Sequence, residues 1–214
     1  MKRPLKRPRK NEPAIRAPTA TPRALERPRS RPSLQHQNGR AGSGQVYKAV
    51  INEGISGNTI GRQGLQPPPD SPPGLERLER DVLSHQGVTD VILFMGTNDI
   101  RREASAAQVM SGIEVLIRRI KARAIRVVSV TVIPRHNNTT NSLWNPAKTA
   151  IRRQVNQWIR ERAPFDAVID FDAVVRDPTD PDRIRSAFNC DEIHPTPRGY
   201  YEMGKSLALD LFRR

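Results

Sequence analysis

The apolar positions of this chain follow two spacings that alternate along the sequence. Apolar residues recur every three or four positions in some segments, which predicts helices over residues 74–86, 104–124, 146–162 and 196–212. Between them are short runs of apolar and β-branched residues, which predict strands over residues 45–52, 91–95, 126–134 and 167–171. Thr196 followed by Pro197 is a typical helix start, because the threonine caps free N–H groups and proline suits the first turn.

The strict alternation of strand and helix predicts an α/β sandwich around a central parallel sheet. Runs such as 91–95 and 127–133 are largely apolar, as expected of strands that are buried on both faces. In sheets of this kind the chemistry gathers in loops at the carboxyl ends of the strands. We therefore look for functional residues in segments 54–58, 96–99 and 191–194.

The charge of the chain is concentrated at its N-terminus. The formal net charge is +14, from 36 Lys and Arg residues against 22 Asp and Glu residues. Residues 1–40 alone contain twelve of the basic residues and only two of the acidic ones. That segment therefore has a net charge of +10 with seven prolines, and the rest of the chain only +4. We predict a disordered, basic, Pro-rich leader over residues 1–44 and one globular domain over residues 45–214.

Several classes of protein are disfavoured by the composition. The leader could bind nucleic acid through its charge, but it has no aromatic residue for stacking on bases, so we expect no nucleic-acid partner. No apolar run is long enough for a transmembrane helix, and no apolar segment follows the basic start as in a secretory signal. The single Cys190 gives no disulfide framework, so the localisation stays open.

Two short segments contain the candidate chemistry. Gly96, Asn98 and Asp99 follow the predicted strand 91–95, where an asparagine amide could donate a hydrogen bond to an oxyanion. A plain turn closed by an Asx hydrogen bond is the alternative. Asp191 and His194 are three residues apart before the last predicted helix, so the carboxylate could orient the imidazole as a base. An ordinary surface loop remains the alternative for that pair. No HExxH motif occurs, and zinc is not indicated.

Taken together, these segments resemble a known family. Gly-Ile-Ser-Gly-Asn (54–58), Gly-Thr-Asn-Asp (96–99) and Asp-x-x-His-Pro (191–195) are similar, in order, to three of the four blocks of the SGNH hydrolases, also called GDSL-type esterases or lipases. The segments LERLERDVL (75–83) and FDAVIDFD (165–172) resemble the secreted bacterial lysophospholipase-like branch. The resemblance extends over roughly residues 48–214 and rests on three blocks in register.

The resemblance implies a fold, a reaction and a set of roles. The expected fold is a three-layer α/β/α sandwich, and the expected reaction is hydrolysis of carboxylic esters through an acyl-enzyme, without metal or organic cofactor. Matched by motif, Gly57 and Asn98 would form the oxyanion hole, His194 would be the general base and Asp191 would orient it. The substrate would be a small-molecule ester, either an acyl lipid or an acetylated sugar, and we expect a monomer.

The first block of the family has no match in this sequence. It is an apolar strand that ends in Gly-Asp-Ser, and its serine is the nucleophile, so the nucleophile is unknown here. By the same analogy that strand is interior and lies between the strands at 48–52 and 91–95, so its loss leaves two unpaired sheet edges. Either those strands close up directly, or the chain is barely stable.

Three explanations remain open. The favoured one is that the abrupt change at residues 40–46 marks a frameshift or misplaced start, so that the leader is not the native N-terminus. The second is a non-catalytic relative that binds a glycan or lipid, and the third is an unusual serine nucleophile. We therefore expect a GDSL-type ester hydrolase whose first block is lost, with the non-catalytic binding protein as the alternative.

Overall fold

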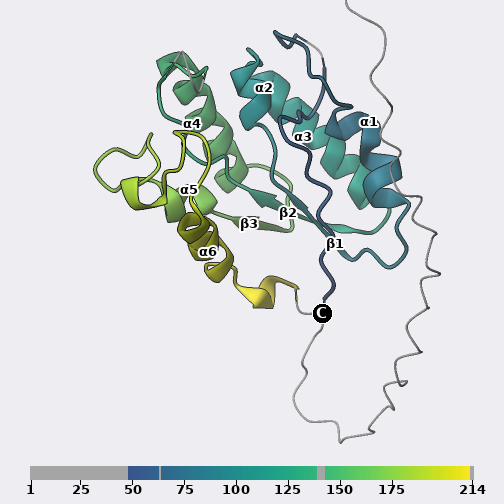
Figure 1. Cartoon of the computed structure of the whole chain (residues 1–214). Helices are drawn as coiled ribbons and strands as arrows, with labels where there is room; N and C mark the ends of the chain where they lie inside the picture. The colour runs from purple at the N-terminus through teal and green to yellow at the C-terminus, as the bar shows by residue number, and fades with distance from the viewer. Residues whose placement is uncertain (1–47, 63, 139–142, 213–214) are drawn as a thin grey trace, which may run out of the picture. The chain divides into compact units, whose positions relative to one another are not determined.

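The computed structural model describes residues 48–62, 64–138 and 143–212. A parallel sheet lies between helices in this part of the chain (Figure 1). The three strands lie in the order β1 (Asp90–Leu93), β2 (Arg126–Val130) and β3 (Ala167–Ile169), and both neighbouring pairs are parallel. The α/β sandwich with a parallel sheet is thus confirmed. The predicted leader, residues 1–44, lies outside the described residues.

The remaining elements are helical. They are, in chain order, α1 (Gly74–Leu78), the π-helical segment η1 (Glu79–Leu83), α2 (Thr97–Arg101), α3 (Ala106–Lys121), α4 (Pro146–Glu161), α5 (Phe171–Val175), the 3-10 turn η2 (Ser186–Phe188), α6 (Pro197–Lys205) and the 3-10 turn η3 (Leu209–Phe212). No helix in the described ranges has the length and apolar character needed to span a bilayer.

The two faces of the sheet are covered by different helices. Side chains alternate between the faces of a strand, so Val127 of β2 joins a cluster with α3 and α4, while Val128 and Val130 join a separate cluster. That second cluster includes Phe171 of α5 and Leu207, near the end of the chain. Helices on both faces of one sheet give the three-layer architecture that the sequence resemblance implies.

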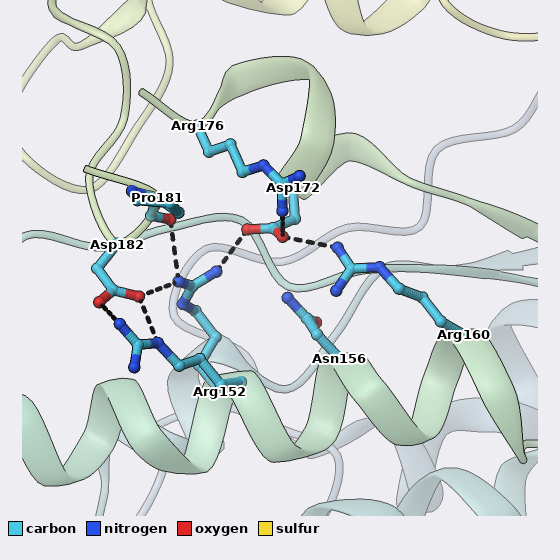
Figure 2. A pocket seen from close by; sticks show the side chains of 8 residues that line it. Arg152, Asn156, Arg160, Asp172, Arg176, Pro181 and Asp182 are labelled. Carbon is cyan, nitrogen blue, oxygen red and sulfur yellow. Dashed lines mark hydrogen bonds and ion pairs between the residues drawn. The ribbon is translucent and has the colours of Figure 1, made fainter. Parts of the chain in front are cut away.

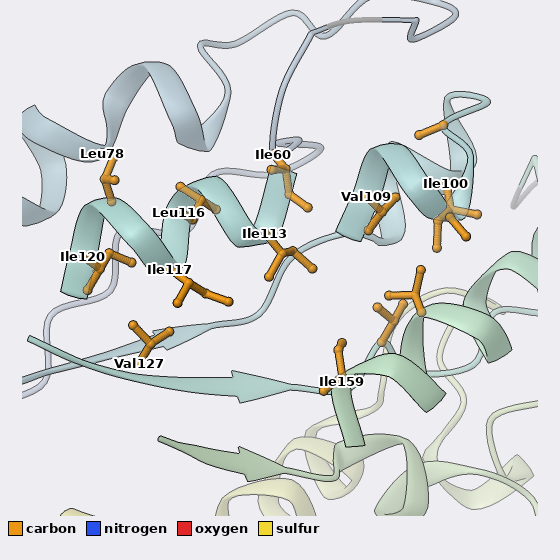
Figure 3. Close-up of a cluster of buried hydrophobic side chains, with 14 of the residues drawn as sticks. Ile60, Leu78, Ile100, Val109, Ile113, Leu116, Ile117, Ile120, Val127 and Ile159 are labelled. Carbon is orange, nitrogen blue, oxygen red and sulfur yellow. The ribbon is translucent and has the colours of Figure 1, made fainter. Parts of the chain in front are cut away.

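The apolar stripe of α3 forms the largest part of the core (Figure 3). Its buried members include Val109, Ile113, Leu116, Ile117 and Ile120, which are the residues predicted from the helical spacing. A capping box begins the helix: the hydroxyl of Ser105 accepts a hydrogen bond from the backbone N–H of Gln108, and the Gln108 side chain accepts one from the Ser105 N–H. The predicted helix 104–124 is therefore confirmed, two to three residues shorter at each end.

The predicted strand at 45–52 does not form within its described part, residues 48–52. Val50 and Ile51 are 87% and 60% exposed, and the segment contacts the sheet through the Lys48 side chain, whose ammonium donates to Thr89 and Asp90. A strand requires a neighbour that accepts its backbone hydrogen bonds. The sequence predicts that neighbour to be the lost first strand, and within the described ranges no other strand takes its place.

The outer edge of β1 is consequently open in the described part of the chain. β1 pairs with β2 on one side, and no backbone hydrogen bond joins it to residues 48–53 on the other. Val91 and Leu93 pack against the α3 cluster, whereas Ile92 and Phe94 on the opposite face remain 45% and 44% exposed. The alternative that the flanking strands close up directly is therefore wrong, and the three-stranded sheet is consistent with a lost interior strand.

Several predicted boundaries are wrong for identifiable reasons. The predicted strand 126–134 ends at Val130 because, beyond it, the Asn156 side chain bonds both the N–H and the C=O of Val132. The predicted strand 167–171 ends at Ile169, since Asp170 caps a short helix by accepting the N–H of Ala173. The last predicted helix, 196–212, is interrupted after Lys205 and resumes as a 3-10 turn.

Candidate active site

Asp191 and His194 form a hydrogen-bonded pair in the loop before α6. The Nδ1 of His194 lies 2.8 Å from one carboxylate oxygen of Asp191, and the other oxygen accepts the backbone N–H groups of Ile193 (3.1 Å) and His194 (2.7 Å). Burial opposes ionisation of Asp191, but the hydrogen bonds from His194 and the backbone outweigh it and hold its pKa below the ordinary value. The side chains are 49% and 61% exposed.

The loop that contains this pair is closed on itself. The N–H of Cys190 donates to the carbonyl of His194 at 3.0 Å, and the N–H of Thr196 donates to Phe188 at 2.7 Å. Thr196 then caps α6 by accepting the N–H of Gly199, as the sequence predicts. With Nδ1–H donating to Asp191, the outer ring nitrogen, Nε2, keeps its lone pair and can accept a proton. The pair therefore has the chemistry of an oriented general base.

Asn98 lies on a short helix rather than on the predicted turn. Gly96 has φ +114, and a Cβ there would lie 3.3 Å from Val109, so a larger residue would be strained and crowded. The chain turns there from β1 directly into α2, which places Asn98 in the first helical turn. The amide nitrogen of Asn98 donates to the backbone carbonyl of Asn58 at 3.1 Å.

Gly57 lies in the neighbouring turn, next to Asn58. Its φ is +69, a conformation that favours glycine, and no hydrogen bond from its N–H is found within the described residues. A hollow of about 110 Å³ opens beside this turn at the carboxyl end of β1, lined among others by Ile55, Asn58 and Asn98. A backbone N–H without a described partner and an oriented side-chain amide are both suitable donors for an oxyanion, but of these two residues only Asn98 lines the hollow.

The four predicted residues thus form two pairs. The structure brings Asp191 to His194, and it brings the loop of Gly57 to Asn98. Gly57, Asp191 and His194 do not line the hollow that Asn98 lines, and no described serine hydrogen-bonds to His194. The roles of all four residues stay predictions.

Asp99 has a structural role that the sequence did not reveal. Both of its carboxylate oxygens accept the backbone N–H of Ile60, at 2.9 and 3.1 Å, which ties the loop of Gly57 to α2. Burial raises the pKa of this carboxyl to about 7, although backbone hydrogen bonds from Ile60 and Gly61 oppose that rise. A polar residue directly after Asn98 was the only signal in the sequence, and it does not distinguish a buried clamp from a turn.

Arg77 holds the same loop from the other side. Its side chain is buried, and it donates to the Asn58 side chain at 3.0 Å and to the carbonyl of Glu53 at 2.7 Å. The charge of Arg77 is balanced by Asp81, four residues later, at 2.9 Å. Arg77 falls in the predicted helix 74–86, but the apolar spacing that predicts this helix gives no sign that the arginine is buried.

The other histidines differ in their surroundings. His85 is exposed beside Glu53, at 3.6 Å, in the bend that follows η1 rather than on the predicted helix 74–86. His136 is buried, and its backbone N–H donates to the carbonyl of Glu192 in the loop of the Asp191–His194 pair. His136 therefore packs against the loop that contains the candidate base. His36 lies outside the described residues.

Comparisons with known proteins agree on one family and fold. Residues 19–201 match the model of the GDSL-like Lipase/Acylhydrolase family. No protein of curated function matches the chain. Among solved structures, a GDSL-like lipase from Bacteroides thetaiotaomicron is similar with a TM-score of 0.54 and 20% identity, over 64% of this chain and 67% of that one.

Two further structures cover more of the chain. A protein described as a putative platelet activating factor from Streptococcus pneumonia has a TM-score of 0.59 and 19% identity, over 77% of this chain and 73% of its own. An acetylxylan esterase from Geobacillus stearothermophilus has a TM-score of 0.53 and 18% identity, over 77% and 72%. At these identities the likeness concerns the fold.

Proposed function

Because this chain belongs to the GDSL-like lipase/acylhydrolase family, we propose that its site serves the hydrolysis of carboxylic esters. The observation that supports this most directly is the 2.8 Å contact between His194 Nδ1 and Asp191, in a loop whose backbone also bonds the carboxylate. In the proposed mechanism His194 is the general base and Asp191 fixes its tautomer. Gly57 and Asn98 donate hydrogen bonds to the oxyanion.

The proposed reaction proceeds through an acyl-enzyme. Nε2 of His194 takes the proton of a serine hydroxyl as that oxygen attacks the ester carbonyl. The negative charge that develops on the carbonyl oxygen is stabilised by the Gly57 N–H and the Asn98 amide. The protonated histidine then gives its proton to the leaving alcohol, and a water molecule hydrolyses the acyl-serine by the same steps.

The serine itself is best placed beside β1. The open edge of β1 and the exposed side chains of Ile92 and Phe94 support an additional apolar strand at that position. A serine at the carboxyl end of such a strand would reach the hollow next to Asn98. The sequence of residues 1–47 contains no apolar run that ends in Gly-Asp-Ser, although the family model matches from residue 19. We propose that a frameshift or misplaced start has replaced this block with the basic leader.

Translation of the DNA upstream of codon 48 in the other two frames tests this part of the proposal. An apolar strand followed by Gly-Asp-Ser in either frame is the expected result. If neither frame encodes such a strand, the frameshift is wrong. The remaining proposal would then have to find its nucleophile elsewhere.

The substrate we propose is an ester with a short acyl group. A hollow of about 110 Å³ is small compared with the roughly 300–1,000 Å³ of pockets that enclose drug-sized molecules. The Geobacillus stearothermophilus protein of the same fold is an acetylxylan esterase, which supports an acetylated sugar over a long-chain lipid. Faster hydrolysis of p-nitrophenyl acetate than of p-nitrophenyl laurate is the expected outcome, and the reverse order would favour a lipid.

The enzymatic role is tested with p-nitrophenyl acetate on the chain whose first block has been restored from the upstream DNA, because no described serine hydrogen-bonds to His194. Turnover that falls by about 10²–10⁴-fold in His194→Ala supports a general base. His85→Ala is the matched control, because this histidine is partly exposed beside Glu53 and has no proposed role in the reaction. Turnover that is equal in His194→Ala and the unmodified chain would exclude His194 from the reaction.

A non-catalytic binding protein is the second candidate. It is favoured by one observation, which is that no described serine hydrogen-bonds to His194. A complete lack of turnover, together with binding of acetylated xylo-oligosaccharides in calorimetry, would identify this role. Loss of that binding in Asn98→Ala would place the ligand in the hollow beside α2.

A further inference from the structure

A second hollow, of about 350 Å³, lies between α4 and the segment that follows α5 (Figure 2). Arg152 and Arg160 face it from α4, where a spacing of eight residues places them on one side of the helix. Arg176 reaches it from the end of α5. It shares no lining residue with the hollow at Asn98, so it is a separate feature of the surface.

One buried carboxylate serves three guanidinium groups in this hollow. Asp172 accepts from Arg152 on one oxygen, and on the other it accepts from Arg160 at 2.7 Å and from Arg176 at 3.5 Å. Arg160 also bonds Asp170, at 2.8 and 2.9 Å, so that arginine is well held. Arg176 is held least, because a 3.5 Å contact is at the limit of a hydrogen bond.

Arg176 therefore has N–H groups to spare. Its side chain is 43% exposed, and within the described residues it makes no hydrogen bond other than the long one to Asp172. The exposed Arg153, which lines the same hollow, bonds Asp182 through Nε and Nη2, which leaves Nη1 without a described partner. Two arginines thus present unused donors at the rim of one hollow.

A buried donor without a partner lies in the same place. The side chain of Arg152 is 3% exposed, and its two terminal nitrogens bond Asp172 and Asp182. Its Nε finds no hydrogen-bond partner in the described residues. Buried donors are rarely left unpaired, and such an atom calls for an explanation beyond the ion pairs themselves.

We propose that this hollow binds a small molecule through its phosphate or sulfate group. Guanidinium groups offer paired N–H donors whose spacing matches the oxygens of such a group. The spare donors of Arg176 and Arg153 would hold the oxyanion from two sides. The volume of about 350 Å³ exceeds what a single oxyanion needs, so the ligand has a further part beyond that group. This site is independent of the proposed ester hydrolysis.

Thermal unfolding of the full chain tests the proposal. Inorganic phosphate, sulfate and glycerol 3-phosphate are compared at one ionic strength, which is held constant with sodium chloride. At a ligand concentration about tenfold above its Kd, the expected rise in Tm is about 3–5 °C. The same rise is expected in Arg118→Gln, which removes one exposed arginine from α3 and controls for charge.

Arg176→Gln is the decisive variant, because it removes the spare donors and leaves the better hydrogen bonds of Asp172 in place. We expect its Tm to rise by less than half as much with the same ligands, and Arg153→Gln to behave likewise. Each variant is compared with itself in chloride, so a change in its own stability does not affect the result.

The outcomes are clearly separated. A greater shift with glycerol 3-phosphate than with phosphate identifies an organic ester as the ligand, and equal shifts identify the free oxyanion. Equal shifts in the unmodified chain, Arg118→Gln and Arg176→Gln would place binding elsewhere, for example on the basic leader, and would overturn the proposal. No shift with any of the three ligands would overturn it as well.

Discussion

The Asp99→Asn substitution tests how the loop of Gly57 is held against α2. Burial raises the pKa of the Asp99 carboxyl from 3.8 to about 7, so near neutral pH the folded state binds a proton that the unfolded state has released. Where the folded state binds more protons, stability falls as the pH rises. The contribution of Asp99 is therefore fully favourable only below about pH 4, and it is lost as the pH rises through 7.

The magnitude follows from the two pKa values. With 3.8 in the unfolded chain and about 7 in the folded one, the free energy of unfolding falls by about 2–3 kcal/mol between pH 5 and pH 8. Asparagine approximates the protonated carboxyl and does not titrate. The Asp99→Asn variant therefore lacks this part of the pH dependence, whatever constant offset the substitution adds.

Urea unfolding at several pH values between 5 and 8 measures the effect. The difference between the unmodified chain and Asp99→Asn cancels the titration of the histidines, which both proteins share. Asp70→Asn is the matched control, because that side chain is 99% exposed. If the free energy of unfolding depends on pH in the same way for the unmodified chain and for Asp99→Asn, Asp99 is ionised in the folded state. The hydrogen bonds between Asp99 and Ile60 would then need another explanation.

Three further substitutions test other parts of the account. Ser105→Ala removes the cap of α3 and should lower the free energy of unfolding by about 1 kcal/mol in urea titrations, and an unchanged midpoint would contradict the capping role. Gly96→Ala should lower the free energy of unfolding by about 1–3 kcal/mol, because φ is +114 and the new Cβ would crowd Val109. A variant as stable as the unmodified chain would refute that strain. Asp191→Asn should keep the fold but reduce ester turnover by up to about 10⁴-fold through the wrong histidine tautomer, and unaltered turnover would exclude that role.

The helices and the order of the elements could be predicted because their signals are local. The stripe of α3 and the Thr196 cap of α6 are visible in a few consecutive residues, and both form as expected. The strand at 48–52 could not be judged in this way. Its sequence suits a strand, but a strand also depends on a partner, and the predicted partner is absent from the sequence.

In the candidate site, contacts between residues that are close in sequence could be predicted, and contacts between distant residues could not. Asp191 and His194 are close in sequence, and the spacing that suggested a hydrogen bond does produce one. The contacts of Asp99 with Ile60 and of Arg77 with Asn58 join residues that are far apart in the chain. The hollow at Arg176 likewise brings together separate segments, so no sequence pattern could have indicated it.

The central claim is that His194 and Asn98 act on the same ester. It is tested most directly in the chain with its first block restored, by p-nitrophenyl acetate hydrolysis in His194→Ala, Asn98→Ala and the double variant, with His85→Ala as control. The account predicts a loss of about 10²-fold or more in kcat/KM for each single variant. The kcat/KM that remains in the double variant should be well above the value expected if the two losses multiplied, because the effects of groups that act as one unit are not additive. Full turnover in either single variant, or independent losses that multiply, would contradict a shared reaction centre.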